Sequence, residues 1–123
     1  MKQSPAVTII TGELDLLASR SLGQRLSEEV GAGVAASDVI LDLSAVSFID
    51  SSALGVILQA DQRLGRQGRG LAVVAPEGTV VADLVKITHV DRSLRIAESR
   101  ADAVAQLREA DDDADDAASA MRS

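Results

Sequence analysis

The residues best suited to chemistry lie in one short stretch, residues 47–55, which reads SFIDSSALG. It follows an apolar run typical of a buried strand, and an amphipathic helix is expected to begin at Ser51 or Ser52. Free backbone N–H groups and the positive end of the helix dipole favour an anion there, so this position could hold a phosphate. The alternative is purely structural, with a serine as the helix N-cap and Asp50 as a carboxylate matched to the dipole.

A nucleophilic serine would need a general base within hydrogen-bond reach, and the only histidine, His89, is expected at the end of another helix. The Gly-x-Ser-x-Gly pattern of many hydrolases does not occur in the sequence. The chain contains no cysteine, and a single histidine cannot form a His-rich zinc site. We therefore expect no catalytic residue, no metal site and no cofactor.

A second polar stretch, residues 12–15, reads GELD and is expected to form a turn between the first strand and the first helix. Glu13 and Asp15 could ligate a hard cation, but EF-hand spacing is missing and no third oxygen ligand follows nearby. The favoured interpretation is a tight turn followed by a helix N-terminus, where acidic side chains are favourable. Contact with a partner is the alternative. The glycine-rich run 65–70 lacks the Gly-Lys-Ser/Thr ending of a phosphate loop and precedes a strand, so it is interpreted as a turn.

Hydrophobic periodicity predicts that strands and helices alternate along the chain. Apolar residues four positions apart, at Leu22, Leu26 and Val30, are typical of one helix face. The expected strands are residues 6–11, 39–43, 71–74 and 94–96, and the expected helices are 16–30, 51–67, 79–87 and a last one capped by Ser99. This order predicts a single α/β domain, with a mostly parallel or mixed β-sheet and about four helices joined by right-handed crossovers.

The acidic residues gather at the end of the chain, which has 12 basic and 19 acidic residues and a net charge of −7. Residues 109–123 hold six of these acids and one arginine, net −5, whereas residues 1–108 are nearly balanced at −2. We therefore expect a folded domain over residues 1–108 and an acidic disordered tail over residues 109–123. The negative charge disfavours nucleic acid and anionic membranes as partners.

The first residues contain no apolar stretch of signal-peptide length, and no window of about 18 uncharged apolar residues occurs in the sequence. A cytoplasmic protein is therefore expected. Phe48 is the only aromatic residue, so the core must consist of aliphatic side chains, and few stacking platforms exist for bases or sugars.

The order of these segments resembles a known family. The run VILDLSAVSFIDSSALGVIL, with GELD upstream and LAVVAPEGTVVADLVKITHVDRSL downstream, resembles the STAS domain of bacterial anti-sigma factor antagonists over roughly residues 6–108. The Asp-Ser-Ser-x-Leu-Gly segment is its most specific element. The resemblance implies a domain with no active site of its own, which is the substrate of an anti-sigma factor that is also an ATP-dependent serine kinase of the GHKL type.

The resemblance also implies roles for individual residues. Ser51 matches the phosphorylated serine of the family, and the implied mechanism is partner switching. The unphosphorylated antagonist binds the anti-sigma factor and frees the sigma factor, phosphorylation blocks that binding, and a metal-dependent serine phosphatase reverses it. The implied partner-binding residues are Gly12, Glu13, Asp15, Asp50, Ser51, Ser52, Leu54 and Gly55.

Three departures from the family pattern stand out. Ala53 replaces a frequent glycine, which a helix tolerates, and His89 replaces the glycine of a Thr-Gly-Leu-Asp pattern, where a turn would be less relaxed. The family's first edge strand is expected to be truncated or missing. An alternative function is a STAS module that is never phosphorylated and acts as a scaffold or as the soluble subunit of a transport complex. Phosphorylation of Ser51 would distinguish the two.

Overall fold

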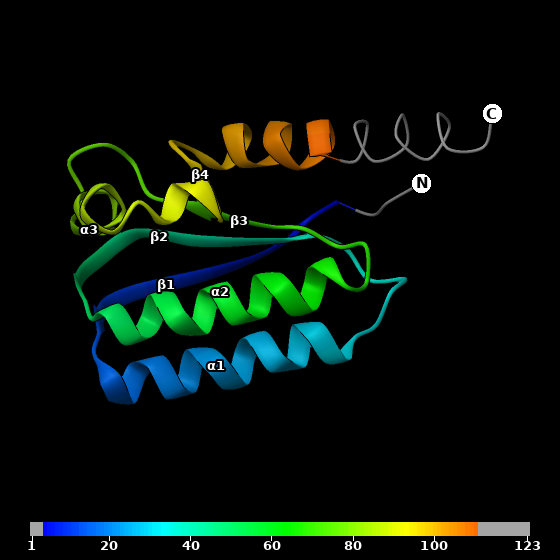
Figure 1. The fold of residues 1–123 in the computed structure, drawn as a ribbon, viewed down its shortest axis with the longest axis horizontal. Helices are drawn as coiled ribbons and strands as arrows, with labels where there is room; N and C mark the ends of the chain where they lie inside the picture. The colour runs from blue at the N-terminus through cyan, green and yellow to red at the C-terminus, as the bar shows by residue number, and fades with distance from the viewer. Residues whose placement is uncertain (1–3, 111–123) are drawn as a thin grey trace.

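The computed structural model describes residues 4–110 and contains the predicted alternation of strands and helices (Figure 1). Its strands are β1 (Ala6–Leu14), β2 (Val39–Ile49), β3 (Leu71–Val74) and β4 (Arg95–Ala97). Its helices are α1 (Leu16–Gly31), α2 (Ser51–Gly65), α3 (Val80–Thr88), the short 3-10 helix η1 (Val90–Arg92) and a C-terminal helix described over residues 100–110. Residues 109 and 110 of the predicted tail continue this helix, and residues 111–123 lie outside the described part of the chain.

The four strands form one sheet in the order β1-β2-β3-β4, and every neighbouring pair is parallel. Parallel neighbours require a crossover between them, which α1, α2 and α3 provide. Figure 1 shows α1 and α2 side by side on one face of the sheet and the C-terminal helix on the opposite face. The predicted α/β fold is thus confirmed, and the carboxyl ends of β1 and β2 lie at the edge of the sheet where α1 and α2 begin.

The central strand β2 extends beyond the predicted residues 39–43, as far as Ile49. Its second half pairs with β1 alone, with Glu13 opposite Phe48 and Leu14 opposite Ile49. β3 pairs only with the first half of β2. Residues 39–43 of β2 are buried, whereas several side chains of residues 44–49 are exposed. The apolar run in the sequence therefore ends at residue 43, although the strand continues to Ile49.

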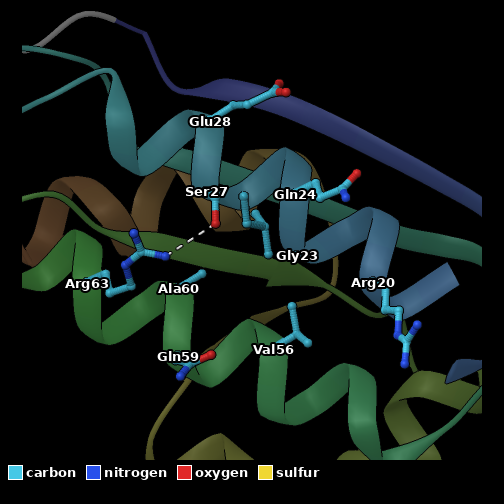
Figure 2. A pocket seen from close by; sticks show the side chains of 10 residues that line it. Arg20, Gly23, Gln24, Ser27, Glu28, Val56, Gln59, Ala60 and Arg63 are labelled. Atoms are coloured by element: carbon cyan, nitrogen blue, oxygen red, sulfur yellow. Dashed lines mark hydrogen bonds between the residues drawn. The ribbon is translucent and has the colours of Figure 1, made fainter. Parts of the chain in front are cut away.

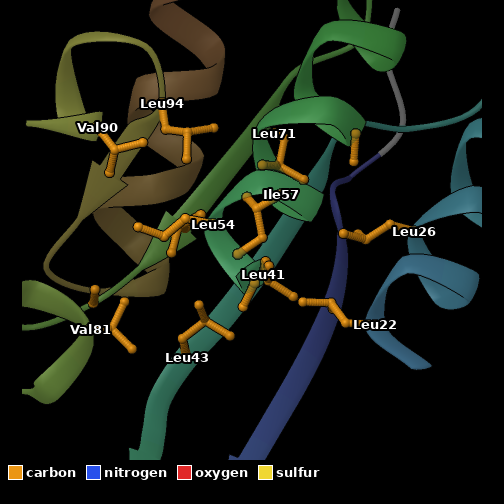
Figure 3. Close-up of a cluster of buried hydrophobic side chains, with 14 of the residues drawn as sticks. Leu22, Leu26, Leu41, Leu43, Leu54, Ile57, Leu71, Val81, Val90 and Leu94 are labelled. Atoms are coloured by element: carbon orange, nitrogen blue, oxygen red, sulfur yellow. The ribbon is translucent and has the colours of Figure 1, made fainter. Parts of the chain in front are cut away.

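The two faces of β2 contribute to two separate cores. Leu41 and Leu43 pack with α1, α2 and α3 in an aliphatic cluster (Figure 3), whereas Ile40 packs under the C-terminal helix. Asp42 lies on the second face, where its carboxylate accepts a hydrogen bond from Arg100 Nε at 2.8 Å and is only 8% exposed. Burial acts to raise the pKa of Asp42, but hydrogen bonds from Ser44 and Arg100 outweigh it, so this pKa lies below its ordinary value.

The turn before β3 contains a buried arginine that the sequence analysis did not anticipate. Arg69 is 3% exposed. Its Nε donates to the carbonyl of Ser37 at 2.9 Å, and its Nη1 donates to the carbonyl of Glu29 at 2.7 Å and to Gln67 Oε1 at 2.8 Å. Arg69 therefore connects the last turn of α1 and the loop that follows it to the turn that precedes β3.

We expect Arg69→Leu to lower the free energy of unfolding by about 2–4 kcal/mol, because the carbonyl of Ser37 loses the donor Nε and that of Glu29 loses the shorter of its two hydrogen bonds in a desolvated region. Arg66 provides a matched control, since it is exposed in the same turn. Arg66→Leu should change stability by about 0.5 kcal/mol or less. Urea unfolding followed by circular dichroism measures both variants, and equal losses would contradict the structural role of Arg69.

Candidate functional site

The polar stretch at the end of β2 forms the start of α2, with Asp50 rather than a serine as the N-cap. The backbone of Asp50 is extended, with φ −93° and ψ 148°, and its carboxylate accepts the N–H of Ser52 at 2.8 Å. Its own N–H donates to the carbonyl of Leu14 at 2.9 Å. The prediction that Ser51 or Ser52 caps the helix was therefore wrong by one position. Ser51 is the first helical residue, and its side chain is exposed.

The start of α1 lies beside the start of α2. Asp15 caps α1 by accepting the N–H of Ala18 at 2.9 Å, and Ser19 Oγ donates to the carbonyl of Asp15 at 2.8 Å. The hydroxyls of Ser19 and Ser52 are 3.4 Å apart, which joins the two helix starts. Sequence reasoning missed Ser19, although its spacing from Leu22 places it on the buried face of α1.

Gly12 and Glu13 belong to β1 and not to the predicted turn. Gly12 has φ of +79°, which favours glycine, and it lies where the register between β1 and β2 shifts. The sequence pattern predicted that the strand ends before Gly12. Instead, β1 continues through this register shift to Leu14. Glu13 follows, exposed and opposite Phe48, so both residues reach the same end of the sheet as Asp50.

Ser51 opens onto a surface hollow of about 410 Å³ between the first turns of α2 and the end of α3. Both Leu54 and Gly55 belong to α2, where Gly55 is exposed and Leu54 is buried in the main core. The hollow is lined by Ser51, Leu54, Gly55, Leu58, Thr88, His89, Val90 and Ser93. The predicted site residues Ser51, Leu54 and Gly55 therefore lie together with residues of α3 and η1 that sequence reasoning did not select.

A second hollow, of about 280 Å³, lies where the end of β2 meets α3. Its lining includes three exposed apolar side chains, Phe48 (49% exposed), Val80 (40%) and Ile87 (75%). Large apolar side chains gathered on a surface are typical of a protein-binding region. Phe48 is three residues from Ser51 in the chain, so this apolar region borders the helix start that carries the serine.

A further hollow, of about 640 Å³, lies between α1 and α2 and contains none of the predicted site residues (Figure 2). Its floor is made by small side chains, because Gly23 and Ala60 let the two helices approach closely. A Cβ on Gly23 would contact Val56 Cγ1 at 3.5 Å. The rim carries Arg63, whose Nη1 lies 3.3 Å from Ser27 Oγ. We interpret this groove as a consequence of helix packing.

Ser51 presents an exposed hydroxyl. Among the described residues, no general base is hydrogen-bonded to this hydroxyl. His89 is exposed, and within residues 4–110 its ring has no carboxylate hydrogen-bonded to it. In the same range, no three His, Cys, Asp or Glu side chains gather closely enough to hold a metal ion. None of the helices described is long and apolar enough to cross a membrane.

The structure is an α/β domain. Its four strands form one parallel sheet, and the helix that follows β2 carries a serine in its capped first turn. The chain belongs to the STAS domain family, whose model matches residues 1–103. A curated relative, the anti-sigma-F factor antagonist RsfB of Mycobacterium tuberculosis, is 29% identical over 103 residues, which cover 84% of this chain and 81% of the relative. The family resemblance read from the sequence is thereby confirmed.

Two solved structures share the fold. TM1081 of Thermotoga maritima is 27% identical, with a TM-score of 0.69 over 83% of this chain and 87% of that chain. An anti-sigma factor antagonist from Mycobacterium paratuberculosis is 24% identical, with a TM-score of 0.75 over 88% of this chain and 89% of that chain. The second likeness supports the fold alone.

We expect Asp50→Ala to lower the free energy of unfolding by about 1 kcal/mol, because the N–H of Ser52 loses its acceptor. Ser52→Ala should cost less, since its hydroxyl makes only a long contact with Ser19. Asp50→Asn keeps an acceptor and serves as the control. Chemical unfolding of the three variants tests this order, and a larger loss for Ser52→Ala than for Asp50→Ala would contradict the assignment of the cap.

Proposed function

We propose that this chain is an anti-sigma factor antagonist that works by partner switching, binding an anti-sigma factor when Ser51 is unphosphorylated. Membership of the STAS family and the name of the mycobacterial relative support this function. The observation that carries it is the exposed hydroxyl of Ser51 on a rigidly capped helix start, with an apolar region beside it.

Ser51 is the serine that receives the phosphate. Its neighbour Ser52 is half-buried and contacts Ser19, whereas the side chain of Ser51 faces solvent and can enter a partner's active site. In the transfer, Ser51 Oγ forms a bond to the γ-phosphorus of ATP held by the anti-sigma factor, ADP leaves, and a base of the kinase takes the hydroxyl proton. A GHKL-type serine kinase fits this requirement because the antagonist supplies only the acceptor.

Phosphorylation changes the charge of the contact surface without requiring a change of fold. The phosphate adds about −1.5 to −2 charges at the N-terminus of α2, where the helix dipole and free N–H groups stabilise it. A partner that packs against Ser51 and the neighbouring apolar side chains Phe48 and Ile87 would have to bury this charge. Binding is therefore lost by local electrostatics and bulk, and a metal-dependent serine phosphatase restores it.

The remaining residues of the partner surface surround Ser51 at the same end of the sheet. They are Gly12 and Glu13 on β1, Asp15 and Asp50 at the helix caps, and Ser52, Leu54 and Gly55 on α2. Asp15 and Asp50 act mainly as helix caps, since the carboxylate of Asp15 accepts the N–H of Ala18 in α1 and that of Asp50 accepts the N–H of Ser52 in α2. Glu13 is exposed and is the residue of this set best placed to pair with a basic side chain of the partner.

We expect a cognate GHKL-type serine kinase to phosphorylate Ser51 with ATP, and Ser51→Ala to abolish incorporation while Ser52→Ala retains it. Mass spectrometry of the digested protein locates the phosphate. Phosphate on another residue, or none with an active kinase, would refute the assignment and favour a STAS module that is not regulated in this way.

We expect Ser51→Asp to weaken binding to the anti-sigma factor at least tenfold, about 1.4 kcal/mol, while Ser51→Ala binds as the parent does. Ser21→Asp adds the same charge at an exposed position on α1 and is the matched control. Calorimetric titration gives the dissociation constants. Equal affinities for Ser51→Asp and Ser51→Ala would argue against a charge-based switch.

A further inference from the structure

The only histidine of the chain lines the same hollow as the proposed phosphoacceptor. Ser51 approaches this hollow from the first turn of α2, and His89 from the junction of α3 and η1. The two residues are 38 positions apart in the chain and are brought together only by the packing of these elements. A group attached to Ser51 Oγ therefore extends into a space that an imidazole borders.

The composition of the hollow suits a negatively charged group. Its lining contains the hydroxyl of Ser93 besides that of Ser51, and it includes no carboxylate. The hydroxyl of Thr88 also lines the hollow but donates to the carbonyl of Leu84 at 2.8 Å. The carboxylate of Asp50, the N-cap of α2, accepts the N–H of Ser52. On the other side, η1 contributes Asp91 and Arg92, which line a separate hollow, and Lys86 of α3 pairs with Glu77 at 2.6 Å. His89 is thus the only titratable side chain in the lining.

The backbone of His89 adopts an unusual conformation that its side chain does not explain. Its φ of +57° is the only positive φ among the non-glycine residues from 4 to 110. Its N–H donates to the carbonyl of Val85 at 2.8 Å and its carbonyl accepts the N–H of Arg92 at 3.2 Å, so its position is well defined. The ring itself is exposed and makes no side-chain hydrogen bond with the described residues. Glycine would relax this position, whereas His89 places an exposed imidazole at the hollow that Ser51 also lines.

We propose that His89 is a phosphate-binding residue, whose ring N–H donates a hydrogen bond to the phosphate carried by Ser51. This inference rests on the proposed phosphorylation of Ser51 and adds a residue that holds the product of that reaction. A phosphate at Ser51 meets the N-terminus of α2 on one side and the imidazole on the other. This hydrogen bond would fix the phosphate over the hollow, where it blocks the surface used by the partner.

Phosphorus NMR tests this contact in a protein that carries phosphoserine at position 51, introduced by suppression of a nonsense codon so that no kinase is needed. The second ionisation of phosphoserine has a pKa of about 6, and a hydrogen bond donated to the phosphate dianion lowers this pKa. We expect the midpoint in the parent to lie about 0.5 pH unit or more below the midpoint in His89→Asn. The N-terminus of α2 acts equally in both proteins, so their difference reports on His89.

Two further variants make the result specific. The phosphoserine should have the same midpoint in His89→Gly as in His89→Asn. Glycine and asparagine both accept a positive φ, so both variants are expected to fold, which circular dichroism can verify. Arg92→Gln removes a full positive charge from η1 outside the hollow and should leave the midpoint at the parent value. Equal midpoints for the parent and His89→Asn, or an equal shift in Arg92→Gln, would overturn the proposal. The failure of a kinase to modify Ser51 would instead refute the proposed function.

Discussion

Asp50 makes two hydrogen bonds on which the geometry of the site depends. Its N–H donates to the carbonyl of Leu14 at the end of β1, and its carboxylate accepts the N–H of Ser52 in the first turn of α2. One residue therefore determines both how the ends of β1 and β2 are joined and where α2 starts. Ser51 lies between these two anchors, so its backbone is held while its side chain remains exposed. The backbone at the proposed partner surface around Ser51 is therefore held in place by the elements that carry it.

The sequence was sufficient to predict the fold, and its errors have physical causes. The helix faces followed from the spacing of leucines and valines, and the parallel sheet followed from the alternation of elements. The cap of α2 was misplaced by one residue, because Asp and Ser are about equally good N-caps. β2 was predicted too short, because its second half has exposed side chains. Arg69 was not expected to be buried, because arginine usually lies on the surface.

The hollow beside Ser51 could not be predicted, because its two sides come from segments that only tertiary packing unites. The sequence marked position 89 as one where a glycine would be more relaxed, and the positive φ of His89 confirms that reading of the backbone. It gave no sign that the imidazole borders the serine. The apolar hollow of Phe48, Val80 and Ile87 was missed for the same reason, since β2 and α3 meet there only in the folded chain.

The spatial order of the strands repeats their order along the chain. Among the described residues, each strand pairs only with the strand before it and the strand after it, so no gap in the sheet waits for a distant segment. Each strand after the first therefore has its pairing partner already synthesised when it leaves the ribosome. The C-terminal helix emerges last and covers Ile40 and Val74. The order in which the strands are synthesised is therefore also their order across the sheet.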